Sequence, residues 1–109
     1  MQVYHGTNAA KLPQIEAEGV DEPSYWTNNY AVAKEYADSH GNGVVLAVAL
    51  GQYDFKANMG VARCLFENED IDELPDESDL TYSLEYLEGI VCHDRVRDFD
   101  VVRAPPSTQ

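Results

Sequence analysis

Near its N-terminus the chain reads Tyr4-His5-Gly6-Thr7, in which a histidine is followed at once by a glycine and a small polar residue. Residues 2–5 predict a short strand, and Thr7 can begin a turn after it. Glycine has no Cβ, so a ligand can approach the backbone closely beside the hydrogen-bonding imidazole of His5. This segment therefore predicts a place where a polar ligand meets the end of a strand.

A second segment, Ser24-Tyr25-Trp26-Thr27, is aromatic and runs into a helix-like pattern. We expect a short strand over 25–27, followed by a helix that Asn28 or Asn29 caps and that continues to about His40. An aromatic side chain then lies opposite the histidine of the first segment. The pair predicts a pocket for a flat, polar ligand.

The rest of the chain predicts further strands and helices, with no internal repeat. Val44–Leu50 is continuously apolar, which is typical of a strand covered on both faces. Residues 53–65 are compatible with short strand or short helix, and residues 67–79, with eight carboxylates, predict an exposed loop or frayed helix. The expected elements are a strand over 2–5, a helix over 8–18 ended by Gly19, a strand over 25–27, a helix to about 40 with Val32, Ala33, Tyr36, Ala37 and His40 on one face, and strands over 44–50, 86–93 and 99–103.

Length and composition predict one domain over residues 1–103, followed by a mobile tail over 104–109. Seven basic and twenty acidic residues give a net charge of −13, which repels nucleic acids and membranes and favours a partner with a basic surface. No segment approaches the roughly 20 apolar residues of a membrane helix, and we expect no secretory signal. Cys64 and Cys92 are expected to be reduced thiols in a cytosolic protein.

Glu88 is the acidic residue with the most unusual expected environment. Strand alternation over 86–93 would place it on one face with Tyr86, Ile90 and Cys92. A carboxylate among apolar and aromatic groups is costly unless it is paired or used, which makes Glu88 a candidate catalytic group. The histidines and cysteines share no metal-ligand spacing, so we predict no metal site.

Three segments resemble the diphtheria-toxin and poly(ADP-ribose) polymerase branch of the ADP-ribosyltransferases. The His-Gly-Thr at residues 5–7 is similar to the motif that opens this branch, and Tyr25-Trp26-Thr27 is similar to its second motif. Residues 88–94, with the sequence Glu-Gly-Ile-Val-Cys-His-Asp, are similar to its third motif. The order His, Tyr, Glu along the chain is also the order of the family.

The resemblance implies an α+β fold in which a split pair of antiparallel sheets, with flanking helices, holds NAD⁺ as a substrate. It implies His5, Tyr25 and Glu88 as catalytic residues. His5 would hydrogen-bond the adenosine ribose, and Glu88 would accept from the nicotinamide ribose and stabilise an oxocarbenium-like state. The residues implied to bind NAD⁺ are His5, Gly6, Thr7, Tyr25 and Tyr36, with the nicotinamide ring between the two tyrosines.

Two assignments within these motifs stay open. Trp26 is the alternative to Tyr25 after a slip of one residue, and Glu85 is the alternative to Glu88 if the third motif begins earlier. Tyr86 stands two residues before Glu88, where arginine-specific toxins carry an acid. The sequence therefore does not support arginine as the acceptor.

The resemblance implies a mono-ADP-ribosyltransferase that modifies a macromolecule, most simply a protein. A chain of this size suits a bacterial or phage effector or toxin in the cytoplasm of a bacterial cell or an infected host cell. Transfer to a small molecule and hydrolysis of NAD⁺ are variants of the same chemistry. The net charge supports an alternative of another class, a non-catalytic acidic inhibitor that binds the nucleic-acid site of a basic protein.

Overall fold

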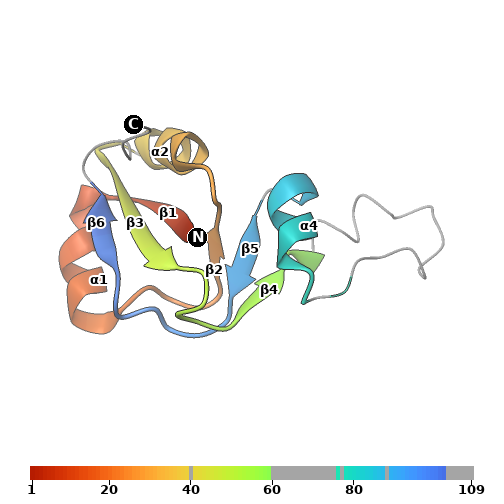
Figure 1. Cartoon of the computed structure of the whole chain (residues 1–109). Coiled ribbons are helices and arrows are strands. Elements are labelled where there is room, and N and C mark those ends of the chain that lie inside the picture. Colours follow the sequence, from red (N-terminus) through yellow and green to blue (C-terminus); the bar gives the residue numbers. More distant parts are fainter. Residues whose placement is uncertain (40, 60–75, 77, 88, 103–109) are drawn as a thin grey trace.

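The computed structural model describes residues 1–39, 41–59, 76, 78–87 and 89–102. Within them, two three-stranded antiparallel sheets and three α-helices form an α+β fold (Figure 1), as the sequence predicts at this level. In chain order the elements are β1 (Gln2–Asn8), the 3-10 turn η1 (Ala9–Lys11), α1 (Leu12–Glu18), β2 (Ser24–Trp26), α2 (Tyr30–Asp38), β3 (Gly43–Ala49), β4 (Phe55–Ala57), α4 (Leu80–Tyr86), β5 (Ile90–Cys92) and β6 (Asp100–Val102).

The first sheet has the strand order β1-β3-β6. Strands β1 and β3 pair over their whole lengths, from Gln2 opposite Ala49 to Asn8 opposite Gly43. Residues 45–48 of β3 are all buried. This burial confirms the expectation that β3 is covered on both faces.

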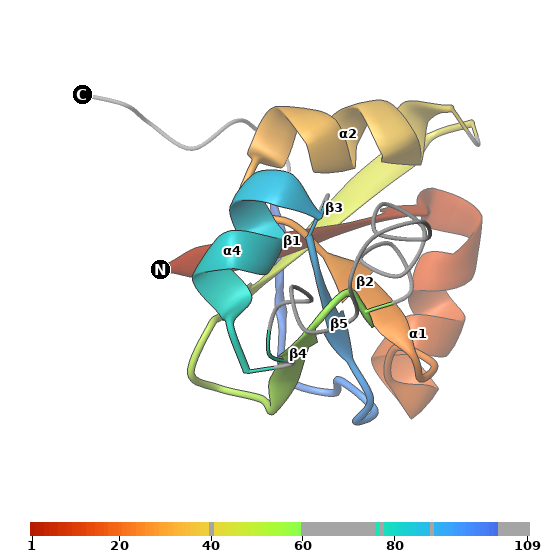
Figure 2. The ribbon, with the colours of Figure 1, turned by 90° about the vertical axis from the view of Figure 1, so that its right-hand side faces the viewer.

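Different parts of the chain cover the two faces of the first sheet. Helix α2 lies across β1 and β3 on one face (Figure 2), where Tyr4, Val45 and Ala47 pack against Ala33. The main core forms on the other face, with α1 at its edge through Leu12 and Ile15. Its buried residues are Val3, Val20, Trp26, Leu46, Val48, Phe55, Ile90, Cys92 and Val96.

Helix α2 has a well-defined cap and lies close to the sheet. The Asn29 Oδ1 accepts hydrogen bonds from the N–H groups of Ala31 and Val32, at 3.0 and 3.3 Å, so Asn29 is the cap residue. A Cβ at Gly6 would collide with the carbonyl oxygen of Ala33. Glycine therefore lets the backbone of α2 rest directly on β1.

The second sheet has the order β2-β5-β4, with three residues in each strand. It joins the first sheet where the Tyr4 N–H bonds the Thr27 carbonyl at 2.6 Å and the Thr27 N–H bonds the Tyr4 carbonyl at 2.9 Å. Among the described residues, β1 and β2 share no other pairing. Figure 1 shows α2 above the first sheet and α4 beside β4 and β5.

Of the strand expected over 86–93, only residues 90–92 form one, as β5. Tyr86 is instead the last residue of α4, which Asp79 caps by accepting a hydrogen bond from the N–H of Tyr82 at 3.1 Å. Gly89 has a φ of +136°, and a Cβ at this position would collide with the carbonyl oxygen of Trp26. Helix capping and this glycine outweigh the alternating pattern, so only β5 remains as a strand.

Two helices differ from the sequence expectation. The chain stays longer in β1, so the helix expected over 8–18 is divided into η1 and the shorter α1. On α2, Ala33 and Ala37 are buried as expected, whereas Val32 and Tyr36 are 50% and 60% exposed. The buried stripe of α2 is narrow because the helix rests on the sheet through its alanines.

Three other strands are confirmed, each starting within one residue of its expected position: those over 25–27, 44–50 and 99–103. In the segment 53–65, where strand and helix were both compatible, β4 is a strand. Most of the acidic segment 67–79, Cys64 and the tail expected over 104–109 lie outside the described residues. No helix in the described part of the chain has the length and apolarity that crossing a membrane requires.

Candidate functional site

A cleft with a volume of about 610 Å³ is formed by parts of β1, β2, α2 and α4 and by the segment that joins β2 to α2. Its walls combine aromatic rings, asparagine amides and backbone groups. No Lys, Arg, Asp or Glu occurs among its described lining residues. These are Tyr4, His5, Gly6, Tyr25, Trp26, Thr27, Asn28, Asn29, Val32, Ala33, Tyr36 and Leu84.

Gly6 directs its backbone N–H and C=O away from β3. Both backbone groups of Tyr4 bond to Thr27, on the edge of β1 opposite to β3. In an antiparallel strand, residues two apart direct their N–H and C=O groups to the same edge. Gly6 lines the cleft, and no described strand pairs with this edge beyond Tyr4. One donor and one acceptor are therefore available there, an arrangement that suits a planar carboxamide.

Two neighbouring aromatic residues of β2 have different environments. Trp26 is 1% exposed, its indole N–H donates to the Oγ of Ser24 at 2.8 Å, and its ring packs edge-on against Phe55. Tyr25 is 59% exposed and lines the cleft. Strand alternation places the two rings on opposite faces. Tyr25 therefore has the accessible ring, while Trp26 belongs mainly to the core.

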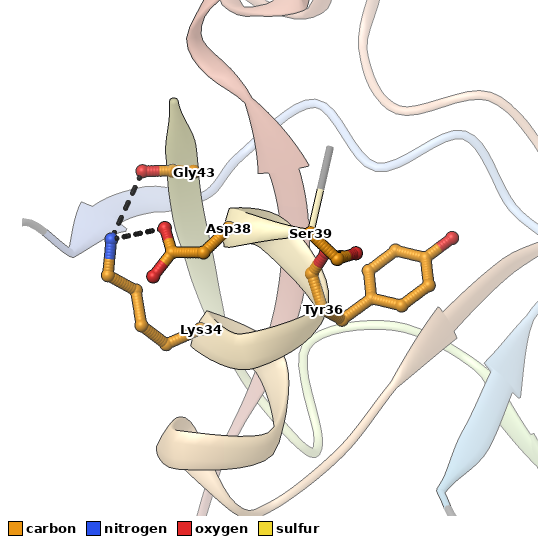
Figure 3. Close-up of polar contacts among 5 residues, drawn as sticks. All are labelled: Lys34, Tyr36, Asp38, Ser39 and Gly43. Atoms are coloured by element: carbon orange, nitrogen blue, oxygen red, sulfur yellow. Dashed lines mark hydrogen bonds and ion pairs between the residues drawn. The ribbon is translucent and has the colours of Figure 1, made fainter. Parts of the chain in front are cut away.

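Tyr36 projects from the side of α2 that faces away from Lys34 (Figure 3). The Lys34 Nζ contacts the Asp38 Oδ1 at 2.9 Å and the Gly43 carbonyl oxygen at 3.4 Å, so that side of α2 is tied to the start of β3. The Tyr36 ring lies on the other side and lines the cleft. Rings of Tyr25 and Tyr36, from β2 and α2, thus line the same cleft and can stack on a planar ligand.

His5 connects β1 to the backbone of β2. Its Nδ1 lies 2.8 Å from the carbonyl oxygen of Tyr25, and its ring centre lies 5.1 Å from that of Trp26. A carbonyl oxygen only accepts, so Nδ1 donates its proton and Nε2 is an acceptor in the neutral ring. Burial lowers the pKa of His5 below 6.5; the hydrogen bond to Tyr25 opposes this shift, and the charge of Lys11 adds to it. The lowered pKa favours the neutral form of the His5 ring.

Some expected site residues lie elsewhere or cannot be located. Thr7 is 9% exposed, pairs with Val44 of β3 and does not line the cleft, so nothing in the structure supports its expected part in binding. Glu88 lies outside the described residues, and its catalytic role stays a prediction. Tyr86, which the expected strand would place on the same face as Glu88, is the last residue of α4 instead. Glu85 is exposed on α4 and does not line the cleft.

A buried serine, Ser83, holds the residues on either side of Glu88. Its Oγ donates to the carbonyl oxygen of Gly89 at 2.5 Å and accepts from the N–H of Asn58 at 2.8 Å. Its carbonyl oxygen accepts from the N–H groups of Leu87 and Gly89, at 2.9 and 3.2 Å. Ser83 is fully buried, so these bonds are shielded from water and fix how α4 leads into β5.

The sequence pattern did not identify several of the lining residues. Asn28 is indicated only as a possible cap, and Val32 only as part of a buried face, yet both line the cleft. Val32 and Tyr36 are one helical turn apart, a spacing that could have grouped Val32 with the site. Leu84 comes from α4, where a strand was expected to begin, and no sequence signal pointed to it.

Exposed apolar side chains are concentrated at the cleft. Of the five large hydrophobic side chains that the structure describes as exposed, Tyr25, Val32 and Tyr36 line it, whereas Met1 and Tyr86 do not. Apolar surface left in contact with water at a concave site is typical of ligand binding rather than of packing. The cleft therefore suits a planar, uncharged or cationic ring that is surrounded by amide and hydroxyl partners.

The described side chains contain no cluster of three or more histidine, cysteine or carboxylate groups that could hold a metal ion. The cleft is thus a site of aromatic and hydrogen-bonding groups. Comparison with protein-family models, with curated proteins and with solved structures finds no match to this chain.

Proposed function

We propose that this chain is a mono-ADP-ribosyltransferase that binds NAD⁺ in the cleft and transfers ADP-ribose to a protein with a basic surface. The main observation in support is that His5, Gly6, Tyr25 and Tyr36 line one cleft, although they come from three separate elements. The enzyme would act as an effector or toxin in the cytoplasm of a bacterial cell or an infected host cell.

The cleft offers partners for the nicotinamide and for the adenosine ribose of NAD⁺. The carboxamide would exchange hydrogen bonds with the N–H and C=O of Gly6. The positively charged pyridinium ring would lie against Tyr25 and Tyr36, whose ring faces attract cations. The acceptor Nε2 of His5 would take a hydrogen bond from a hydroxyl of the adenosine ribose.

The transfer breaks the bond between the ribose C1′ and the nicotinamide nitrogen. The electron pair of that bond stays on the nicotinamide, which leaves as a neutral ring, and positive charge builds on the ribose. Glu88 is proposed to stabilise this charge with its carboxylate. A nucleophile of the acceptor then bonds to C1′ and loses its proton. The stacked aromatic walls orient the leaving ring and exclude water from the intermediate.

The central experiment tests transfer with a matched pair of acids. The purified protein is incubated with labelled NAD⁺ and a cell lysate, and the label should appear on a discrete protein band. Glu88→Gln should abolish labelling, whereas Glu85→Gln, on the exposed side of α4, should leave it unchanged. Equal labelling by the two variants would remove Glu88 from its proposed role. Release of nicotinamide without labelled protein would identify hydrolysis instead of transfer.

Binding can be tested separately from transfer. Millimolar NAD⁺ should raise the melting temperature, because a ligand that binds only the folded state stabilises it by mass action. Tyr36→Ala should weaken this effect. Tyr86→Ala is the matched control, because Tyr86 is similarly exposed, at 62% against 60%, and does not line the cleft. An unchanged melting temperature in NAD⁺ would contradict the proposal.

The net charge of −13 favours a second candidate, an acidic inhibitor that covers the nucleic-acid site of a basic protein. The described wall of the cleft has no carboxylate, so such an inhibitor would use another surface. It should displace nucleic acid from its target without NAD⁺, and neither Tyr36→Ala nor Glu88→Gln should matter strongly. Dependence of the activity on NAD⁺ separates the two functions.

A further inference from the structure

Asn28 is a polar side chain of the cleft wall that the fold does not use. The adjacent Asn29 also lines the cleft, but its Oδ1 accepts from two N–H groups of the first turn of α2. The Oγ1 of Thr27 accepts from the N–H of Asn29 at 3.2 Å. Within the described part of the chain, the exposed side chain of Asn28 takes part in no such bond. Its amide is therefore available to a ligand.

The backbone on both sides of Asn28 is held in place. The N–H and C=O of Thr27 bond to Tyr4, at 2.9 and 2.6 Å. On the other side, the carbonyl oxygen of Asn29 accepts from the N–H of Ala33 at 3.2 Å, in the first turn of α2. An amide carried by a fixed backbone loses little freedom when a ligand binds, so it contributes more to affinity than an amide on a mobile loop.

Asn28 and Tyr36 line different parts of the cleft. Tyr36 lies about 10 Å further along the axis of α2 than the cap residue Asn29. Gly6 is beside the same later part of the helix, because a Cβ at Gly6 would lie 3.1 Å from the backbone nitrogen of Ala37. The nicotinamide, which is proposed to bind at Gly6 and Tyr36, would therefore lie beyond the first turn of α2. Asn28 lines the cleft at the other end of that helix.

The segment that leads from α4 into β5 lies close to Asn28. A Cβ at Gly89, the residue before β5, would lie 3.8 Å from the Cα of Thr27. Leu84 of α4, next to the serine that bonds Gly89, also lines the cleft. Asn28 follows Thr27 directly, so it lies beside the junction of α4 with β5, in which the chain carries the proposed catalytic residue Glu88. The part of a ligand that reaches Asn28 is therefore the part on which the transfer chemistry acts.

We propose that the Asn28 side chain binds the hydroxyl groups of the ribose attached to nicotinamide. This inference rests on the proposed function, in which that ribose develops positive charge. A hydroxyl both donates and accepts, and the asparagine amide offers an acceptor oxygen and two N–H donors. The amide is uncharged, as is the rest of the described wall, so it does not oppose the charge that builds on the ribose. Asn28 is a binding residue that orients the ribose, and it exchanges no proton in the transfer.

The test compares ligands that share the pyridinium ring but differ in the ribose. Asn28→Ala should bind nicotinamide riboside and NAD⁺ roughly fivefold more weakly, the order expected for one neutral hydrogen bond, and should bind 1-methylnicotinamide as the wild type does. Asn28→Asp should recover affinity for the riboside more than for 1-methylnicotinamide, because a carboxylate accepts from the hydroxyls. Asn42→Ala is the matched control, because Asn42 is exposed and does not line the cleft. Calorimetry at fixed ionic strength measures these affinities.

Two results of these measurements would overturn the inference. An unchanged affinity for the riboside in Asn28→Ala would show that Asn28 contacts no ribose hydroxyl. An equal loss for the riboside and for 1-methylnicotinamide would show that Asn28 only shapes the ring site. NMR provides a second readout, because the side-chain amide signals of Asn28 should shift with the riboside and stay in place with 1-methylnicotinamide. Shifts of equal size with both ligands would also contradict a contact with the ribose.

Labelling of a lysate protein separates the failure of this inference from the failure of the proposed function. If the wild type binds the riboside, Asn28→Ala weakens that binding and no protein is labelled from NAD⁺, then the ribose site holds and the transferase proposal fails. If protein is labelled but Asn28→Ala keeps full affinity for the riboside, the ribose site fails alone. If the wild type binds neither the riboside nor NAD⁺, both proposals fail.

Discussion

The two sheets of this protein are stabilised in different ways. In the first sheet, β1 and β3 each have seven residues and pair along their full length, around an apolar run that is buried on both sides. In the second sheet, every strand has three residues. A positive φ at Gly89 and the hydrogen bonds of Ser83 hold its β5 and α4 together.

This difference shows which of the two sheets that frame the cleft tolerates single substitutions and which does not. The first sheet distributes its stability over many apolar contacts, so most single substitutions there remove only a fraction of it. The second sheet shares the main core through Trp26, Phe55 and Ile90, but its short strands pair over only three residues, so the polar and steric contacts of Ser83 and Gly89 contribute more there. Gly6 is an exception in the first sheet, because the backbone of α2 touches β1 there. A large effect is therefore expected at this contact.

Gly6→Ala should be among the most damaging single-methyl changes in the described part of the chain. The new Cβ would collide with the carbonyl oxygen of Ala33 and lie 3.1 Å from the backbone nitrogen of Ala37. Helix α2 would have to move off the sheet, which we expect to cost about 3 kcal/mol of unfolding free energy. Tyr36 would move with the helix, so NAD⁺ binding should fall as well. Urea denaturation measures the first effect and calorimetry the second.

The matched control for this substitution is Gly51→Ala. A Cβ at Gly51 meets no atom within 4 Å, so the expected change in stability is below about 0.5 kcal/mol. Similar destabilisation by the two variants would show that the contact between α2 and β1 is not the reason for glycine at position 6.

Ser83→Ala should have the second largest effect, and it tests the second sheet. The substitution leaves the carbonyl oxygen of Gly89 and the N–H of Asn58 without their hydrogen-bond partner in a buried site. Unpaired buried groups of this kind cost about 2 kcal/mol in total or somewhat more. Ser39→Ala is the control, because Ser39 is exposed and its Oγ donates only to the carbonyl oxygen of Tyr36. A loss no larger than that of the control would contradict the role of Ser83.

The same difference explains which parts of the fold could be predicted from the sequence. A long pattern was sufficient to predict β3, because its continuous apolar run has one interpretation. The segment around α4 contains two competing patterns, because Leu80, Leu84 and Leu87 follow helical spacing while residues 86–92 alternate like a strand. The cap at Asp79 selects the helix. A sequence pattern alone does not show whether helix capping or the alternating strand pattern decides the structure.

The residues of the candidate site also divide into those that the sequence predicted and those that it could not. The motifs predicted that His5, Tyr25 and Tyr36 belong to one site, and all three line the cleft. Asn28 and Leu84 could not be assigned, because their position depends on how α2 and α4 sit against the sheets. That placement comes from contacts between distant residues, such as the contact of Gly6 with Ala33, which leave no local pattern in the sequence.

A smaller effect is expected at the start of α2, where two neighbouring asparagines both line the cleft. Asn29→Ala removes the side-chain acceptor for two N–H groups of the first helical turn and should cost about 1 kcal/mol. Asn28→Ala should leave stability within about 0.5 kcal/mol of the wild type. Thermal or urea unfolding of the two variants gives the comparison directly, and equal losses would show that the cap contributes nothing specific.

The smallest expected effect is at the junction of the two sheets, where His5 of β1 bonds the backbone of β2. Burial lowers the pKa of His5 in the folded protein below 6.5, the ordinary value that the unfolded chain is expected to have. Between these two pKa values the unfolded chain binds more protons than the folded one, so stability falls as the pH drops below about 6.5 and levels off under the folded pKa. An NMR titration of the ring should give a midpoint below 6.5. His5→Gln should remove this component of the pH dependence. A midpoint at or above 6.5 would mean that burial does not control the pKa of His5, because water reaches the ring or because the hydrogen bond to Tyr25 outweighs burial.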